Sequence, residues 1–187
     1  MKIITYNHRR SIRLPGYDYT QPGAYFITIC THNRQCLFGD IANGEMVLNE
    51  WGKMVWDEWF KSQSIRNEIT LYDNEFAVMP NHIHGIVWIV NTDNIGVNDV
   101  GANGRSPLQL PMTQPIGSPK RSLSSFVAGF KSAVTKQINQ LRQTPGMPVW
   151  QRNYYEHIIR NNNELHRIQQ YIINNPKNWE LDENYHI

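Results

Sequence analysis

Runs of apolar and β-branched residues alternate along the chain with segments whose apolar residues recur every three or four positions. The continuous runs predict strands, because buried strands are typically rich in such residues. They lie at residues 23–32, 69–79, 82–90 and 149–160. Pro80-Asn81 separates the second run from the third, and so short a connection predicts a hairpin.

Three segments show the helical period. They cover residues 49–63, residues 122–142 and a last stretch that starts near Asn161. Asn49 is a typical N-cap residue, and Glu164 stands at capping-box spacing after Asn161. We expect the last helix to stop at Asn175, because a residue that precedes a proline is disfavoured in a helix.

The predicted order of elements is β-α-β-β-α-β-α in a single domain of residues 1–187. Its first six elements have the order of a ferredoxin-like split βαβ fold, an α+β architecture with an antiparallel sheet and two helices on one face. The seventh element, the helix that carries Tyr171, is an addition to that fold. Residues 91–120 are rich in Asn, Gly, Pro and Ser without any period, which predicts a mobile insertion or linker.

Composition excludes several classes of protein. The 187 residues are 40% hydrophobic and 18% charged, which is enough apolar material for a core and excludes disorder throughout. We find no run of 18 apolar residues and no apolar leader, so we expect a soluble, cytoplasmic protein with no membrane partner. Two cysteines, Cys30 and Cys36, are too few for a disulfide scaffold.

Charge is spread unevenly along the chain. Residues 1–39 hold five basic and one acidic side chain, residues 40–75 hold three and eight, and residues 120–160 hold seven and one. Such segregation is typical of a basic face that binds a polyanion. Ordinary solvated helix faces would produce the same pattern, so charge alone leaves both interpretations open.

Two short motifs suggest chemistry. His82 and His84 are two apart on a predicted strand, so both imidazoles face one side and could bind one metal ion. Tyr171 and Asn175 are four apart on the last helix and share a face, which places a hydroxyl nucleophile beside an oxygen ligand. Each motif alone is more often structural, and their joint occurrence favours function.

The chain resembles the single-tyrosine HUH transposases, and most closely the REP-associated tyrosine transposases of bacteria. The matching stretches are RRSIRLPGYDYTQPGAYFITICTHNR, VMPNHIHGIVWIV, SLSSFVAGFKSAVTKQINQ and VWQRNYYEHIIR followed by YIINNP. They cover nearly the whole chain apart from residues 91–120 and the last ten residues.

The resemblance implies a metal-dependent enzyme that nicks single-stranded DNA and transfers strands through a 5′-phosphotyrosine intermediate. It implies Tyr171 as the nucleophile, His82 and His84 as ligands of Mg²⁺ or Mn²⁺, and Asn175 as a third ligand. Relatives often carry glutamine at this last position, which leaves direct contact by the shorter asparagine open. The implied substrate is hairpin DNA of palindromic repeats in a bacterial chromosome, and the implied location is the nucleoid.

Other residues enter as rivals or as DNA contacts. Tyr154 and Tyr155 are rival nucleophiles, but their predicted strand position favours Tyr171, and His157 is more typical of a structural histidine. The basic side chains expected to contact DNA phosphates are Arg9, Arg10, Arg13, Lys120, Arg121, Lys131 and Lys136.

Two other functions stay open at this point. One is a nucleic-acid-binding module of the same fold that does not cleave, and the other is a metal-dependent phosphoesterase in which Tyr171 only packs. The sequence leaves monomer and homodimer open as well.

Overall fold

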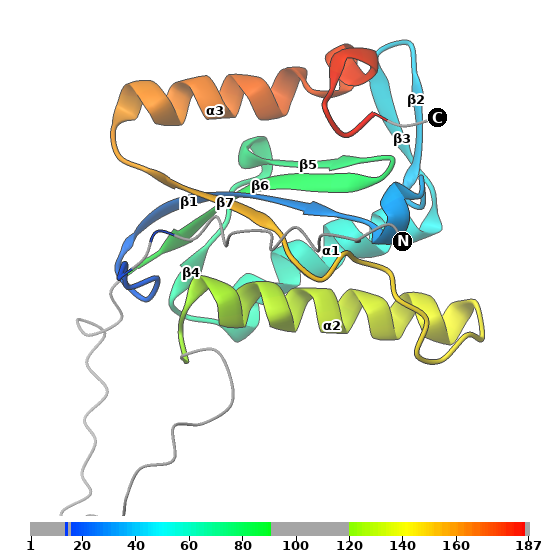
Figure 1. Cartoon of the computed structure of the whole chain (residues 1–187), viewed down its shortest axis with the longest axis horizontal. Helices are drawn as coiled ribbons and strands as arrows, with labels where there is room; N and C mark the ends of the chain where they lie inside the picture. The colour runs from blue at the N-terminus through cyan, green and yellow to red at the C-terminus, as the bar shows by residue number, and fades with distance from the viewer. Residues whose placement is uncertain (1–13, 15, 91–119, 186–187) are drawn as a thin grey trace, which may run out of the picture.

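The structure is a computed structural model that describes residue 14 and residues 16–90 and 120–185 (Figure 1). Arg9, Arg10, Arg13 and the insertion predicted at residues 91–120, except Lys120, lie outside the described residues.

The centre of the fold is a five-stranded sheet in which every pairing is antiparallel. Its strands are β1 (Gly23–Cys30), β4 (Ile69–Thr70), β5 (Phe76–Met79), β6 (His82–Ile89) and β7 (Tyr155–Ile159). Their order is β4-β6-β1-β7, and β5 also pairs with β6. Met79 pairs with His82 across Pro80-Asn81, so the predicted hairpin is confirmed. The prediction of an antiparallel sheet combined with helices is also confirmed.

The helices α1 (Glu50–Ile65) and α2 (Leu123–Leu141) cover one face of the sheet, and α3 (Asn162–Asn174) covers the other (Figure 1). The main core lies on the α1–α2 face. There the fully buried Trp59 stacks on Phe76 at 4.3 Å and meets the edges of Phe126 and Phe130. Gly85 of β6 makes this packing possible, because a Cβ at that position would lie 2.5 Å from the Trp59 ring.

Local sequence accounts for the position of α3. The Asn161 side chain accepts a hydrogen bond from the Glu164 backbone amide and caps the helix, as predicted. The capping box suggested by the spacing of Glu164 is not formed, because the Glu164 side chain accepts instead from the Arg160 backbone amide. Ile168 and Ile172 are buried against apolar residues of β1 and β6, which anchors the helix to the sheet. The helix ends at Asn174, and the 3₁₀ turn η3 (Pro176–Leu181) follows. Among the described residues, no helix is both long and apolar enough to span a bilayer.

Two predicted strands are shorter in the structure. The run at residues 69–79 is divided into β4 and β5 by the 3₁₀ turn η2 (Asp73–Glu75). Asp73 and Asn74 are poor strand residues, and Glu75 turns inward to accept hydrogen bonds from Trp88 and Gln169. The run at residues 149–160 forms only β7, preceded by one isolated bridge between Trp150 and Thr31.

Sequence reasoning missed a second, two-stranded sheet. It consists of β2 (Gly39–Ala42) and β3 (Glu45–Leu48), which follow the 3₁₀ turn η1 (His32–Arg34). Asn43 and Gly44 connect the strands with φ values of 53° and 75°, as an Asn-Gly hairpin turn requires. That dipeptide was the signal available in the sequence.

Candidate active site

The alternation of side chains along β6 places both histidines of the HIH motif on the face covered by α3. His82 pairs with Cys30 and His84 with Thr28 across the β1–β6 ladder. Both imidazoles are buried, and their Nε2 atoms lie 2.8 Å apart. The expectation that the two rings point to one place is therefore met.

The outer nitrogens of the two rings are held by polar neighbours. Asn81 donates its amide to the carbonyls of Arg34 and Asn184, so its oxygen faces His82 Nδ1 at 2.8 Å. That contact makes His82 Nδ1 the protonated nitrogen and leaves a lone pair on Nε2. His84 Nδ1 lies 2.8 Å from the Thr28 hydroxyl. Metal-binding histidines are commonly oriented in this way by a second partner.

Burial keeps the histidine pair neutral. It lowers the pKa of His82 well below the ordinary value of 6.5, and the nearby His84 lowers it further. Burial also lowers the pKa of His84, although the Asp182 carboxylate opposes that shift. Neutral imidazoles have the lone pairs that a cation needs.

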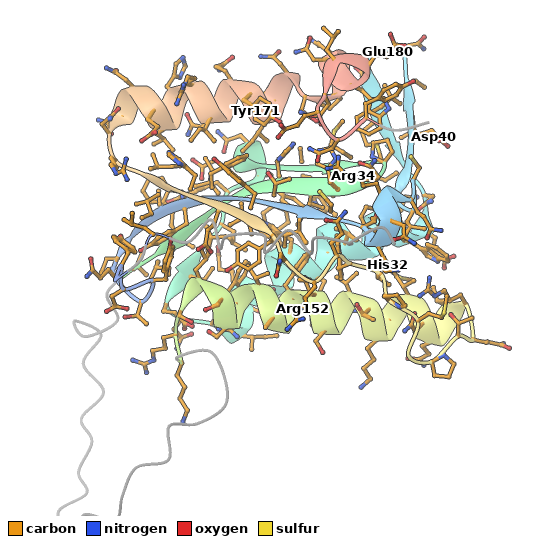
Figure 2. The ribbon with its side chains drawn as sticks, in the orientation of Figure 1. His32, Arg34, Asp40, Arg152, Tyr171 and Glu180 are labelled. Atoms are coloured by element: carbon orange, nitrogen blue, oxygen red, sulfur yellow. The ribbon has the colours of Figure 1, made fainter. Side chains whose placement is uncertain are left out.

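Tyr171 reaches this pair from α3. Its hydroxyl lies 3.2 Å from His84 Nε2, and its ring meets the edge of Phe26. Figure 2 shows the side chain on the side of α3 that faces the sheet. Burial, followed by the negative charges of Asp182 and Glu183, raises the pKa of the hydroxyl above its ordinary value of 10.0. The group is therefore a neutral phenol at neutral pH, and an added positive charge would favour the phenolate.

Asp182 is the site residue that sequence reasoning missed. It follows η3, and its Oδ2 accepts hydrogen bonds from Asn175 Nδ2 at 2.7 Å and from the Tyr171 hydroxyl at 3.4 Å. Its Oδ1 accepts a hydrogen bond from the backbone amide of Asn184. The Asp182 side chain is 1% exposed. Burial alone would raise the pKa of this carboxyl, but the nearby His84 and hydrogen bonds from the Asn175 side chain and the Asn184 backbone amide bring it below the ordinary value. A single acidic residue beyond the recognisable motifs gave no signal in the sequence.

The ligand atoms of His82, His84 and Asp182 lie within 4.8 Å of one another. Two imidazoles and a carboxylate are suitable donors for Mn²⁺ or Mg²⁺ and leave positions open. Asn175, which was expected to supply a third ligand, is 3% exposed and directs its nitrogen at Asp182. Its Oδ1 is buried and has no hydrogen-bond partner within the described residues, so an oxygen donor is free beside the group. The residues present fit a divalent cation.

The rival residues have other surroundings. Tyr154 packs against the main core on the opposite face of the sheet. Tyr155 lies on the α3 face and is 42% exposed, with its ring edge against Phe26. His157 Nε2 lies 2.7 Å from the Glu164 carboxylate, so this histidine links β7 to the start of α3.

The four described basic residues expected to bind DNA, Lys120, Arg121, Lys131 and Lys136, are not gathered at Tyr171. Lys120, Arg121 and Lys136 are exposed on or just before α2, which lies across the sheet from α3 (Figure 1). Lys131 differs from the expectation of a free phosphate contact. It is half-buried, and its Nζ donates to the carbonyls of Gln151 at 2.6 Å and Arg152 at 3.1 Å.

Comparisons with known proteins give this chain a relative by sequence and a neighbour by fold. No protein-family model matches the chain. An uncharacterized protein of Haemophilus influenzae is 42% identical over 180 residues, which cover 96% of this chain and 94% of that protein. The structure of a REP-associated tyrosine transposase bound to a REP hairpin superimposes with a TM-score of 0.52 at 20% identity, covering 86% of this chain and 70% of that one. The chain thus belongs to one family with the Haemophilus influenzae protein, and its fold is that of the REP-associated tyrosine transposase.

Proposed function

We propose that this protein nicks single-stranded DNA and transfers strands through a 5′-phosphotyrosine intermediate, in a metal-dependent reaction. One observation carries the proposal: the Tyr171 hydroxyl lies 3.2 Å from His84 within the His82–His84–Asp182 group. A nucleophile beside a cation site is an arrangement that supports phosphoryl transfer to a side chain.

The chain's own groups account for the covalent step. The Tyr171 oxygen attacks the phosphorus, the bond from phosphorus to the 3′ oxygen breaks, and the leaving oxygen takes a proton to become a 3′-hydroxyl. The Tyr171 hydroxyl donates to Asp182 Oδ2 at 3.4 Å, and this carboxylate is the acceptor for the phenolic proton, because the lone pair on His84 Nε2 would bind the cation. The reverse attack, by a 3′-hydroxyl on the phosphotyrosine, joins strands and regenerates the tyrosine.

The proposed cation is Mg²⁺ or Mn²⁺. His82, His84 and Asp182 would hold it, and Asn175 Oδ1 is the oxygen available beside them. When bound, such an ion polarises a phosphate oxygen and stabilises the charge that develops in the transition state. Asp182 also gives the site a negative charge, which favours cation binding over a site made of neutral ligands alone.

The proposed frame is a ferredoxin-like split βαβ fold with α3 added to carry the nucleophile. The strand order β4-β6-β1-β7 and the two helices on one face support this description. The proposed substrate is a hairpin with a single-stranded flank, as in palindromic repeats. It is supported by the likeness to a transposase that was solved with a REP hairpin. Lys120, Arg121 and Lys136, together with Arg9, Arg10 and Arg13, are the proposed phosphate contacts.

A cleavage assay tests the proposal. A labelled hairpin with a single-stranded flank is incubated with the protein and Mn²⁺ or Mg²⁺, and nicked strands are separated on a denaturing gel. We expect nicking that EDTA and Tyr171→Phe abolish and that Tyr154→Phe, the matched control in the other core, preserves. A blunt duplex of the same sequence should be inert, because it must be unpaired before its backbone can bend into the site.

Other outcomes would favour the two remaining functions. Tight hairpin binding without nicking under any metal would indicate a binding module. Hydrolysis of small phosphoesters that Tyr171→Phe leaves unchanged would indicate a phosphoesterase in which Tyr171 only packs.

A further inference from the structure

We propose that the cleft in front of Tyr171 is a subsite for one unpaired nucleotide next to the scissile phosphate, with Tyr155 stacking on its base and Arg167 binding its phosphate. The inference rests on the proposed function and specifies how that site holds its DNA. The cleft has a volume of about 460 Å³ and opens beside the nucleophile. Its lining includes Phe26, Tyr155, Arg167, Tyr171, Leu181 and Asp182.

Tyr155 supplies an aromatic surface at the cleft. It lies on β7, the last strand in the order of the sheet, and 42% of it remains exposed. The Phe26 ring supports it from the neighbouring strand, at a centroid distance of 6.1 Å. A supported but exposed ring offers a flat face on which any base can stack. At the rim, the 86% exposed Leu181 adds a second apolar surface.

Arg167 supplies the cation of the cleft. It precedes Tyr171 by four residues on α3, so the two side chains leave the same face of the helix one turn apart. Its side chain is 77% exposed, and its ion pair with Glu164 is long, at 3.8 Å. An exposed pair of that length is weak, so a phosphate can replace it at little cost. A guanidinium binds phosphate oxygens in a two-pronged geometry.

The charged side chains of the cleft determine how the single-stranded DNA lies in it. Asp182 and Glu183 line it near the Tyr171 hydroxyl, and both contribute negative charge there. A phosphate that is not neutralised by a cation is repelled from that end and attracted to Arg167. In the proposed function the cation held by the histidines and Asp182 would bind the scissile phosphate, so the next phosphate along the DNA strand is the one that lies at Arg167, one helical turn away.

Fluorescence of 2-aminopurine tests the subsite apart from nicking. The base analogue is placed in turn at each position of the single-stranded flank of a hairpin, and the Tyr171→Phe chain is used so that no adduct forms. We expect quenching at one position. Tyr155→Ala should remove that quenching and weaken binding about tenfold, whereas Tyr155→Phe should keep both. Tyr72→Ala, which alters an equally exposed tyrosine outside the cleft, should have no effect.

A neutral backbone tests Arg167. We expect Arg167→Ala to weaken binding of the ordinary flank about tenfold. The same substitution should leave unchanged the binding of a flank in which a neutral methylphosphonate replaces the phosphate next to the scissile one. Lys61→Ala, which removes an exposed cation on α1, serves as the control. Quenching that Tyr155→Ala leaves intact, or no quenching at any position, would overturn the subsite whether or not the wild-type chain nicks. Tyr155-dependent quenching with a wild-type chain that never nicks would keep the subsite and overturn the proposed function.

Discussion

The two faces of the central sheet differ in what they bury. The α1–α2 face buries a large, continuous apolar cluster built around aromatic rings. The α3 face buries a small one, made of Ala24, Phe26, Ile86, Ile168 and Ile172. Beside that small cluster it buries polar groups, namely His82, His84, Asn175 and the Asp182 side chain.

The α1–α2 face accounts for most of the stability of the fold, and the α3 face holds the groups that could carry out a reaction. Apolar burial stabilises a fold in proportion to the area removed from water, so most of the stabilisation comes from the α1–α2 face. Buried polar groups stabilise little even when they are paired, and one left without a partner is costly. On the α3 face the ligand atoms of His82, His84 and Asp182 are gathered within 4.8 Å of one another, which indicates a function that apolar residues cannot perform.

We expect the greatest loss of stability from a substitution in the core on the α1–α2 face. Trp59→Ala removes a fully buried ring that contacts Phe76, Phe126 and Phe130, and should lower the free energy of unfolding by about 3–5 kcal/mol. Urea denaturation followed by circular dichroism measures it. Tyr171→Phe, on the other face, should cost less than about 1 kcal/mol, because the ring remains. Similar losses for the two variants would contradict the division between the faces.

The next effect concerns the cation. At a Mn²⁺ concentration of about one hundred times the dissociation constant, the metal should stabilise the wild-type chain by about 2.7 kcal/mol. We expect two variants to lose most of this stabilisation by Mn²⁺: the double variant His82→Ala with His84→Ala, and Asp182→Asn. Thermal unfolding with and without the metal measures the loss. His157→Ala is the matched control, since His157 binds Glu164 and should leave the gain intact. A full metal response in the double variant would place the cation elsewhere.

The pH dependence of stability without metal should come from the α3 face. The folded pKa values of His82 and His84 lie below 6.5, so below that pH the unfolded chain binds more protons than the folded one. Stability should thus be full above about pH 6.5 and fall as the solution is acidified further. Asp182, whose pKa is lowered from 3.8, adds stability that is lost at still lower pH. Urea midpoints in EDTA measure this fall, and a double histidine variant that falls as steeply as wild type would contradict it.

The sequence predicts the parts of this molecule that depend on local spacing. Alternation on β6 placed His82 and His84 together, and the Asn161 cap and the helical period of the last segment defined α3. These features depend on neighbours within one element, where the period of a strand or helix fixes direction.

Asp182 could not be found in that way. It reaches the histidines because α3 ends at Asn174 and η3 turns the chain back. No spacing rule connects residue 182 with residue 84. Lys131 shows the same limit. Its helix position suggested a free cation, but the carbonyls of residues 151 and 152, distant in sequence, bind its Nζ.

The smallest expected effect compares two lysines of α2. Lys136→Ala removes an exposed cation, so the slope of log binding constant against log salt should flatten by about one unit on hairpin DNA. Lys131→Ala should leave that slope nearly unchanged and instead lower the unfolding midpoint, because its bonds to Gln151 and Arg152 are lost. Equal changes in slope would show that both lysines contact phosphate.

The role of Tyr171 as nucleophile can be decided by mapping the residue that carries the covalent adduct. After reaction with the hairpin and Mn²⁺, the chain is digested with a nuclease and trypsin, and peptides with added nucleotide mass are sequenced by mass spectrometry. Trypsin separates residues 168–177, whose one tyrosine is Tyr171, from residues 153–160, which contain Tyr154 and Tyr155. We expect a 5′-phosphotyrosine on residues 168–177 alone, and no adduct in EDTA. An adduct on residues 153–160, or none while the DNA is cut, would contradict it.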